Sequence, residues 1–302
     1  MGSVVYQVMC SAALLLLGVY NLICTTRNYL KSPHTYVAKP FHPFPRPPRH
    51  LPFYITIISL LLAIFHHLFL SADFDPLVKG ATPVHRLTSL QSASLFFLFL
   101  LLTLSLLLSD SSPSLLPLPH DLSFALASPL FLLHSFLSST KASLQTSSLE
   151  AKCLSVSSNL SALSALLSLL LAALPRLFPA DAALAAMFCL QGLWELQTGL
   201  SLYADAFIPD GCHRLLDVKS GVEGSTQCDL DRSKFRADAI LDLALSLHAI
   251  FVFLLVLVTY ALVAKTVGVR RLGSYDALPT SSNPTDANHS HIQMKALTGT
   301  QA

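Results

Sequence analysis

The sequence predicts an all-α fold, a polytopic membrane bundle of about seven transmembrane helices, and two observations carry this prediction. Leu-rich stretches long enough to cross a bilayer recur from end to end of the 302 residues. Hydrophobic residues make up 53% of the chain and charged residues only 12%, which is about half the charged fraction of a soluble domain. We therefore expect an integral membrane protein rather than a soluble enzyme with one anchor.

The apolar stretches divide into spans of about 20 residues, the length that crosses the hydrocarbon core. The predicted spans are residues 4–24, 52–71, 88–109, 121–139, 154–174, 181–204 and 238–264. The first has no Lys or Arg before its apolar core and is as long as a full span, so we interpret it as a retained helix rather than a signal peptide. The fourth is the weakest, because it contains Pro129, His134 and several Ser. If it only dips into the membrane, six crossings remain, but neighbouring helices re-satisfy the backbone around a proline and favour seven.

The basic residues of the loops predict the orientation. The first loop is free of acidic residues and holds Arg27, Lys31, Lys39, Arg46 and Arg49. Short basic loops stay on the cytoplasmic side, and seven spans place this loop and the C-terminal tail on the same side. The loop 205–237 also holds five Lys or Arg, together with six Asp or Glu, but its length makes it a weaker indicator. We expect a transmembrane domain over 1–271 with its N-terminus outside or in the lumen, and a disordered cytoplasmic tail over 272–302, which is polar and rich in small residues.

Cys212 and Cys228 share the loop between the last two spans. On the luminal side this pair lies in an oxidising space, which favours a disulfide. The alternatives are two free thiols or a metal site with His213, which lacks a fourth ligand. No cofactor is expected, and a net charge of +2 without a clustered basic domain argues against nucleic-acid binding.

The stretch "LQGLWELQTGLSLY", residues 190–203, places polar side chains inside the sixth span. On a helical wheel, one side carries Gln191, Trp194, Glu195, Thr198 and Ser201, with Gln197 at its edge. Leu193, Leu196 and Leu200 occupy the opposite side and are predicted to face lipid. An ionisable residue at this depth is costly, so Glu195 is a candidate functional residue.

Two hypotheses compete for this polar cluster. In the first, Glu195 forms a proton relay, an ion site or a metal-hydrolase site with His134, Asp242 or His248 from the fourth and seventh spans. In the second, the Glu195 side chain is hydrogen-bonded and fixes helix packing. A metal hydrolase typically presents HxxxH or HExxH spacing, which no span contains, so we favour the structural hypothesis.

The same stretch resembles a signature of the transmembrane protein 45 family and its plant relatives, formerly a domain of unknown function. Its "LQG-x-W-x-x-Q-x-G-x-x-L" pattern is filled here by Leu190, Gln191, Gly192, Trp194, Gln197, Gly199 and Leu202. Members often have a His after the position of Gln91, where this chain has Ser92. The resemblance implies a multi-pass protein of plasma or endomembranes, linked in plants to defence or stress, and it supplies no activity.

The tail adds a sorting hypothesis. Its "YDAL" sequence, from Tyr275 to Leu278, resembles tyrosine-based signals read by clathrin adaptors. We expect a non-enzymatic scaffold, trafficking or partner-binding protein of the plasma membrane or of the Golgi, endosome and vacuole route. The alternative is an intramembrane enzyme or a proton- or ion-coupled carrier using Glu195. A seven-helix receptor ranks last, because DRY-like and NPxxY motifs are absent from the sequence.

Overall fold

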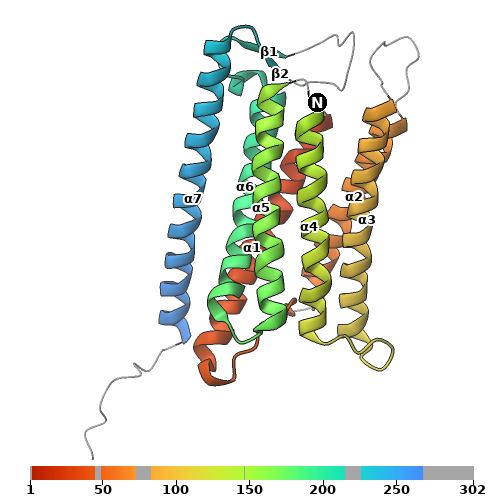
Figure 1. Cartoon of the computed structure of the whole chain (residues 1–302). Coiled ribbons are helices and arrows are strands. Elements are labelled where there is room, and N and C mark those ends of the chain that lie inside the picture. The colour runs from red at the N-terminus through yellow and green to blue at the C-terminus, as the bar shows by residue number, and fades with distance from the viewer. Residues whose placement is uncertain (1, 45–48, 73–82, 146, 215–225, 268–302) are drawn as a thin grey trace, which may run out of the picture. The chain divides into compact units, whose positions relative to one another are not determined.

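The computed structural model of the chain describes residues 2–44, 49–72, 83–145, 147–214 and 226–267. The described residues form seven α-helices, which confirms the all-α prediction (Figure 1). The helices are α1 (Gly2–Lys31), α2 (Leu51–Ala72), α3 (Pro83–Ser111), α4 (His120–Leu144), α5 (Ser148–Ala173), α6 (Phe178–Tyr203) and α7 (Asp231–Val267). Two short 3-10 helices, η1 (Pro33–Thr35) and η2 (Asp205–Phe207), and two strands, β1 (Cys212–Arg214) and β2 (Thr226–Cys228), lie in the connections.

Six of the described helices are long and apolar enough to cross a membrane, namely α1, α2, α3, α4, α5 and α7. The protein is therefore an integral membrane protein. The helix that falls short of this composition is α6 rather than the Pro-containing α4, because Asp181, Glu195 and two glutamines lower the hydropathy of α6. Packing explains why α6 tolerates them: its Cys189 and Trp194 are 0% exposed, since α1, α5 and α7 pack around it.

Successive helices alternate in direction (Figure 1). The N-terminus lies at the same end of the bundle as β1 and β2, whereas the segment after α1 and the end of α7 lie at the opposite end. The basic segment after α1 and the last turn of α7, which contains Lys265, therefore lie at one end. This is the arrangement that an odd number of crossings produces, and the side that faces the cytoplasm stays a prediction.

The contact between α1 and α6 depends on close backbone approach. A Cβ atom on Gly18 would lie 2.8 Å from the backbone nitrogen of Cys189, and one on Gly192 would lie 3.0 Å from that of Leu15. Small residues permit such approach, and in a bilayer packing of this kind drives helix association. The helix that approaches Gly192 so closely is α1.

The hairpin of β1 and β2 covers the end of α6. Cys212 and Cys228 are paired in register and joined by a disulfide. The Thr226 hydroxyl donates to the Leu202 carbonyl oxygen at 2.9 Å, and the Ser147 hydroxyl donates to the Thr226 carbonyl oxygen. These bonds tie the hairpin to α6 and to the start of α5.

Candidate functional site

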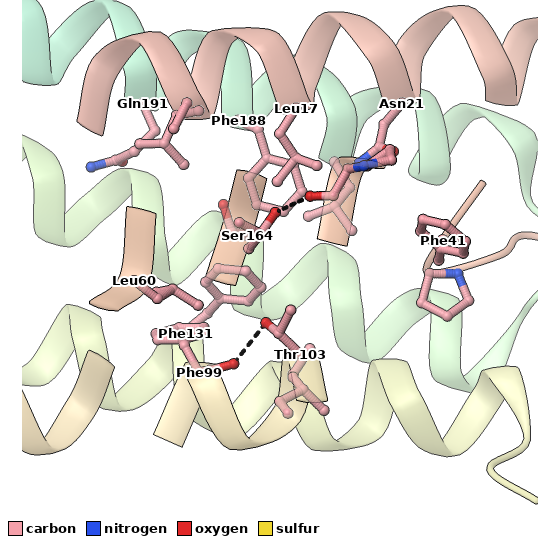
Figure 2. Close-up of a pocket in the computed structure, with 18 of the residues that line it drawn as sticks. Leu17, Asn21, Phe41, Leu60, Phe99, Thr103, Phe131, Ser164, Phe188 and Gln191 are labelled. Atoms are coloured by element: carbon pink, nitrogen blue, oxygen red, sulfur yellow. Dashed lines mark hydrogen bonds between the residues drawn. The ribbon is translucent and has the colours of Figure 1, made fainter. Parts of the chain in front are cut away.

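A cavity of about 350 Å³ lies inside the bundle, lined by all six helices from α1 to α6 and by residues 39–42. Its middle is mainly apolar: Figure 2 shows the side chains of Leu17, Leu60, Phe99, Phe131 and Phe188 around it. The hydroxyls of Ser164 and Thr103 also lie there, and each donates to a carbonyl oxygen of its own helix. The labelled Gln191 lies toward one end of this view, and Asn21 and Phe41 lie toward the other. Polar side chains therefore gather at both ends of an apolar space.

One polar end is built around Glu195, between α5 and α6. The Gln191 amide nitrogen, one turn earlier on α6, donates to Glu195 Oε1 at 3.0 Å and to Ser157 Oγ at 2.8 Å. The Ser157 hydroxyl in turn donates to Glu195 Oε1 at 3.4 Å. The carboxylate therefore has partners on its own helix and on α5, as the structural hypothesis expects, and it also lines the cavity.

His134 of α4 joins this end through α5. The Ser161 hydroxyl donates to the Ser157 carbonyl oxygen at 2.9 Å, so its single hydrogen is used. The 2.6 Å bond between His134 Nδ1 and Ser161 Oγ must then be donated by the histidine. A neutral imidazole with its hydrogen on Nδ1 is a hydrogen-bond acceptor at Nε2. His134 and Glu195 thus line the same cavity. They are linked through Ser161 and Ser157, which lie one turn apart on α5.

The second polar end is built around Asp181 at the start of α6. Its Oδ2 accepts the Thr25 hydroxyl at 3.2 Å and also the Tyr36 hydroxyl. Because Thr25 donates to Asp181, His42 Nε2 donates to Thr25 Oγ1 at 3.3 Å, and His42 Nδ1 accepts from the Asn28 amide at 3.2 Å. Both ring nitrogens of a neutral His42 are satisfied. The cluster connects α1, the segment that follows it and α6.

The electrostatics of the segment after α1 agree with a neutral His42. Burial, together with the positive charges of Lys39 and His120, lowers the pKa of His42 from 6.5 to about 4. Burial beside the Asp181 carboxylate raises the pKa of the Tyr36 hydroxyl well above its ordinary value. At neutral pH the His42 ring is therefore neutral and the Tyr36 hydroxyl keeps its hydrogen, as the hydrogen bonds described above require.

The remaining predicted residues do not meet at the cavity. The Trp194 indole N–H donates to the Cys153 carbonyl oxygen at 3.0 Å, Thr198 is buried, and Gln197 donates to Ser201 at 2.9 Å. These side chains pack between helices. The cavity wall does not include Asp242 or His248.

Asp242 has a different partner. It pairs with Lys152 of α5 at 2.8 Å, and its side chain is 58% exposed. Of the predicted polar cluster, only Gln191, Glu195 and His134 line the cavity. The predicted sorting signal, Tyr275 and Leu278, lies outside the described residues.

Sequence reasoning missed Asp181, Thr25 and the serines of α5. The serines left a readable signal, because buried Ser residues recur at positions 157, 161, 164 and 168, the spacing of one helix face. The low complexity of the Leu/Ser/Ala stretch concealed this pattern. Asp181 was not identified because its partners, Thr25 and Tyr36, come from segments far away in the sequence.

The polar element on α6 lies within a segment that matches a known family. Residues 120–261 match the model of a family of unknown function, DUF716. No curated protein matches the chain. The matched segment runs from α4 into α7 and contains His134, Ser157 and Glu195, whereas α1, α2 and α3, which form the rest of the cavity wall, lie outside it.

Proposed function

We propose that the protein binds a small amphipathic molecule from the bilayer in the cavity lined by α1 to α6. The observation that carries this proposal is the cavity itself, about 350 Å³ with apolar walls and polar groups at both ends. Ligand sites have this composition and begin at about this size. The proposal develops the carrier alternative based on Glu195 and His134. The scaffold and trafficking alternatives depend on the tail, which lies outside the described residues.

A second pocket, of about 210 Å³ between α1 and α2, supports access from the membrane. It shares Tyr6, Cys10 and Ser59 with the cavity. Its outer lining includes Val5 and Met9, which are 62% and 51% exposed. A ligand dissolved in the acyl layer would therefore pass between α1 and α2.

Two ring side chains lie between the second pocket and the cavity. The ring of Tyr6 stacks on that of His66 with centroids 4.0 Å apart. His66 lines the outer pocket and Tyr6 lines both spaces. Stacked rings can separate without breaking a helix, so the pair is suited to admit a ligand between α1 and α2.

Photolabelling tests the binding proposal. A fatty alcohol with a diazirine is activated with the purified chain, and the labelled peptides are identified. We expect labels on residues of the cavity wall, and Ala127→Phe should abolish them because Ala127 lines the cavity. Ala125→Phe is the matched control, since Ala125 is exposed two residues away on the same helix. Equal cavity labelling in both variants, or labels confined to the lipid-facing surface, would contradict the proposal.

A sorting role is proposed for the tail. It places the protein in the plasma membrane or on the Golgi, endosome and vacuole route, with a clathrin adaptor binding Tyr275 and Leu278. Tyr275→Ala should then raise the fraction of protein at the cell surface, and Thr280→Ala, outside the motif, should not. Equal distributions of the two variants would contradict this role.

Kinship with the transmembrane protein 45 family and its plant relatives is also a proposal. It is supported by the family match over residues 120–261 and by the element at 190–203. A link to stress or defence follows from this kinship alone. The residues that match Trp194 and Gln197 can be substituted in an established family member. Loss of helix packing in that member, as expected here, would support the kinship, and tolerance of both substitutions would oppose it.

A further inference from the structure

Four residues around Glu195, namely Gln191, Ser157, Ser161 and His134, use their hydrogen-bond donors among themselves and on Glu195. Gln191 donates to both Glu195 and Ser157, which uses its two amide hydrogens. The hydroxyl hydrogens of Ser157 and Ser161 go to Glu195 and to a backbone carbonyl, and the Nδ1 hydrogen of His134 goes to Ser161. These four residues therefore have no donor hydrogen left for a ligand.

Three acceptors remain at the same end. Both hydrogen bonds that Glu195 receives from described residues end on Oε1. Its Oε2 therefore has no hydrogen-bond donor among the described residues. The Gln191 carbonyl oxygen and His134 Nε2 are the other two, and all three residues line the cavity. A ligand head group that completes this end has to supply donors, and a protonated amine supplies three.

The charge of Glu195 favours an amine over a neutral hydroxyl. Across the described parts of the chain, no Lys or Arg nitrogen lies within 4.0 Å of this carboxylate. Lys141, the buried lysine of α4, donates instead to Ser92 of α3. The Lys141 charge therefore acts on Glu195 only through space. A buried carboxylate without a directly paired counter-charge is costly, and a ligand ammonium would pair with it.

The rest of the cavity fits a hydrocarbon chain. Asp181 lies 14 residues before Glu195 on α6, which is about 21 Å along the helix axis. The wall between them carries Leu17, Leu60 and three phenylalanines, 99, 131 and 188 (Figure 2). An extended alkyl chain would contact these apolar side chains along its length.

The geometry points to a long-chain alkylamine as the ligand of this cavity, with its ammonium group held by Glu195 Oε2, Gln191 Oε1 and His134 Nε2. This assignment rests on the proposed binding function and specifies its ligand class. The head group lies at the end nearer β1 and β2, and the chain extends toward Asp181.

Native mass spectrometry of the detergent-purified full chain tests this assignment. Tetradecylamine, tetradecanol and tetradecanoic acid are compared at equal concentrations, so that only the head group differs. We expect one amine per chain, bound at least about tenfold more tightly than the alcohol or the acid, because hydrogen bonds to charged groups are the stronger ones. Equal binding of amine and alcohol would overturn the amine assignment but leave the proposed binding function of the cavity standing. No binding of any probe would overturn that proposed function as well.

Two isosteric variants locate the head group. Glu195→Gln removes the charge, and we expect it to weaken amine binding at least about tenfold while leaving the alcohol unaffected. Asp181→Asn removes the carboxylate at the other end and should change amine affinity less than about twofold. The opposite pattern, with loss only in Asp181→Asn, would overturn the assignment. Since the wild-type comparison of the three probes requires no variant, the test holds even if Glu195→Gln does not fold.

Discussion

Gly192 in α6 lies directly against Leu15 in α1, so that a Cβ atom on Gly192 would stand 3.0 Å from the Leu15 backbone nitrogen. Backbone atoms cannot move aside as a side-chain end can. Gly192→Ala should therefore separate α1 from α6 and lower the free energy of unfolding by about 1–3 kcal/mol, the cost of overpacking. Thermal unfolding in detergent measures the change. Ala249→Val, on an exposed position of α7, is the control, and equal melting temperatures of the two variants would contradict this prediction.

Trp194 is fully buried and donates its indole hydrogen to the Cys153 carbonyl oxygen at 3.0 Å. Trp194→Phe removes this bond and part of the ring, so we expect a loss of about 1–3 kcal/mol in unfolding free energy. Circular dichroism during heating measures it. Since Trp194 is the single tryptophan of the chain, its fluorescence in the wild type should resist an aqueous quencher. Strong quenching in the folded protein would show that the indole is not packed between α5 and α6.

His42 should make stability depend on pH. It is 5% exposed, and burial lowers its pKa from 6.5 to about 4, so the unfolded chain binds a proton before the folded chain does. Its contribution is present above pH 6.5 and is lost as the pH falls toward 4, by up to about 3 kcal/mol. The melting temperature of the protein should therefore fall as the pH is lowered from 6.5 to 4.

His42→Gln provides the matched control for that pH dependence. Glutamine donates and accepts as the neutral ring does but does not titrate. The variant should keep more of its neutral-pH stability at pH 5 than the wild type does. Parallel pH curves for the two proteins would assign the dependence to other groups.

The disulfide between Cys212 and Cys228 gives a test of orientation, since it lies at the end opposite Lys39. After reduction of intact cells, a membrane-impermeant maleimide should label these two cysteines in the protein that lies in the plasma membrane. A cysteine placed by Lys39→Cys should be labelled only after the membrane is opened. The reverse pattern would invert the predicted orientation.

Removing the same disulfide should also cost stability. Cys212→Ser together with Cys228→Ser frees a loop whose ends are 16 residues apart. The chain-entropy account predicts a loss of about 3 kcal/mol for a loop of this size. Thermal unfolding with and without reductant should converge in this double variant and differ in the wild type. A reductant effect that persists in the variant would show that another cysteine is responsible.

Most of the fold was predictable because a bilayer acts on each segment separately. A span has to satisfy its own backbone over about 20 apolar residues, so hydropathy locates it without knowledge of its neighbours. The exception is α6, on which the helical wheel gathers polar residues along one side. In the structure Trp194 and Thr198 of that side are buried against neighbouring helices, so α6 needs less apolar surface than the helices around it.

Less of the candidate site was predictable. The wheel around Glu195 placed Gln191 beside it, because positions four residues apart share a helix face. It did not indicate that His134 reaches the same cavity through Ser161, or that Asp242 pairs with Lys152. These contacts depend on which helices are neighbours and on how each is rotated about its axis.

The sequence by itself determined the all-α membrane fold and the approximate helix positions, because both follow from local composition and helical period. Only the tertiary structure decided which polar groups meet. It joined Glu195 to Ser157 and His134 to Ser161 at one end of the cavity, and Thr25, His42 and Asp181 at the other. The physical reason is that a buried polar atom takes whichever partner the packing brings within hydrogen-bond distance, and packing depends on the shapes of all the helices together.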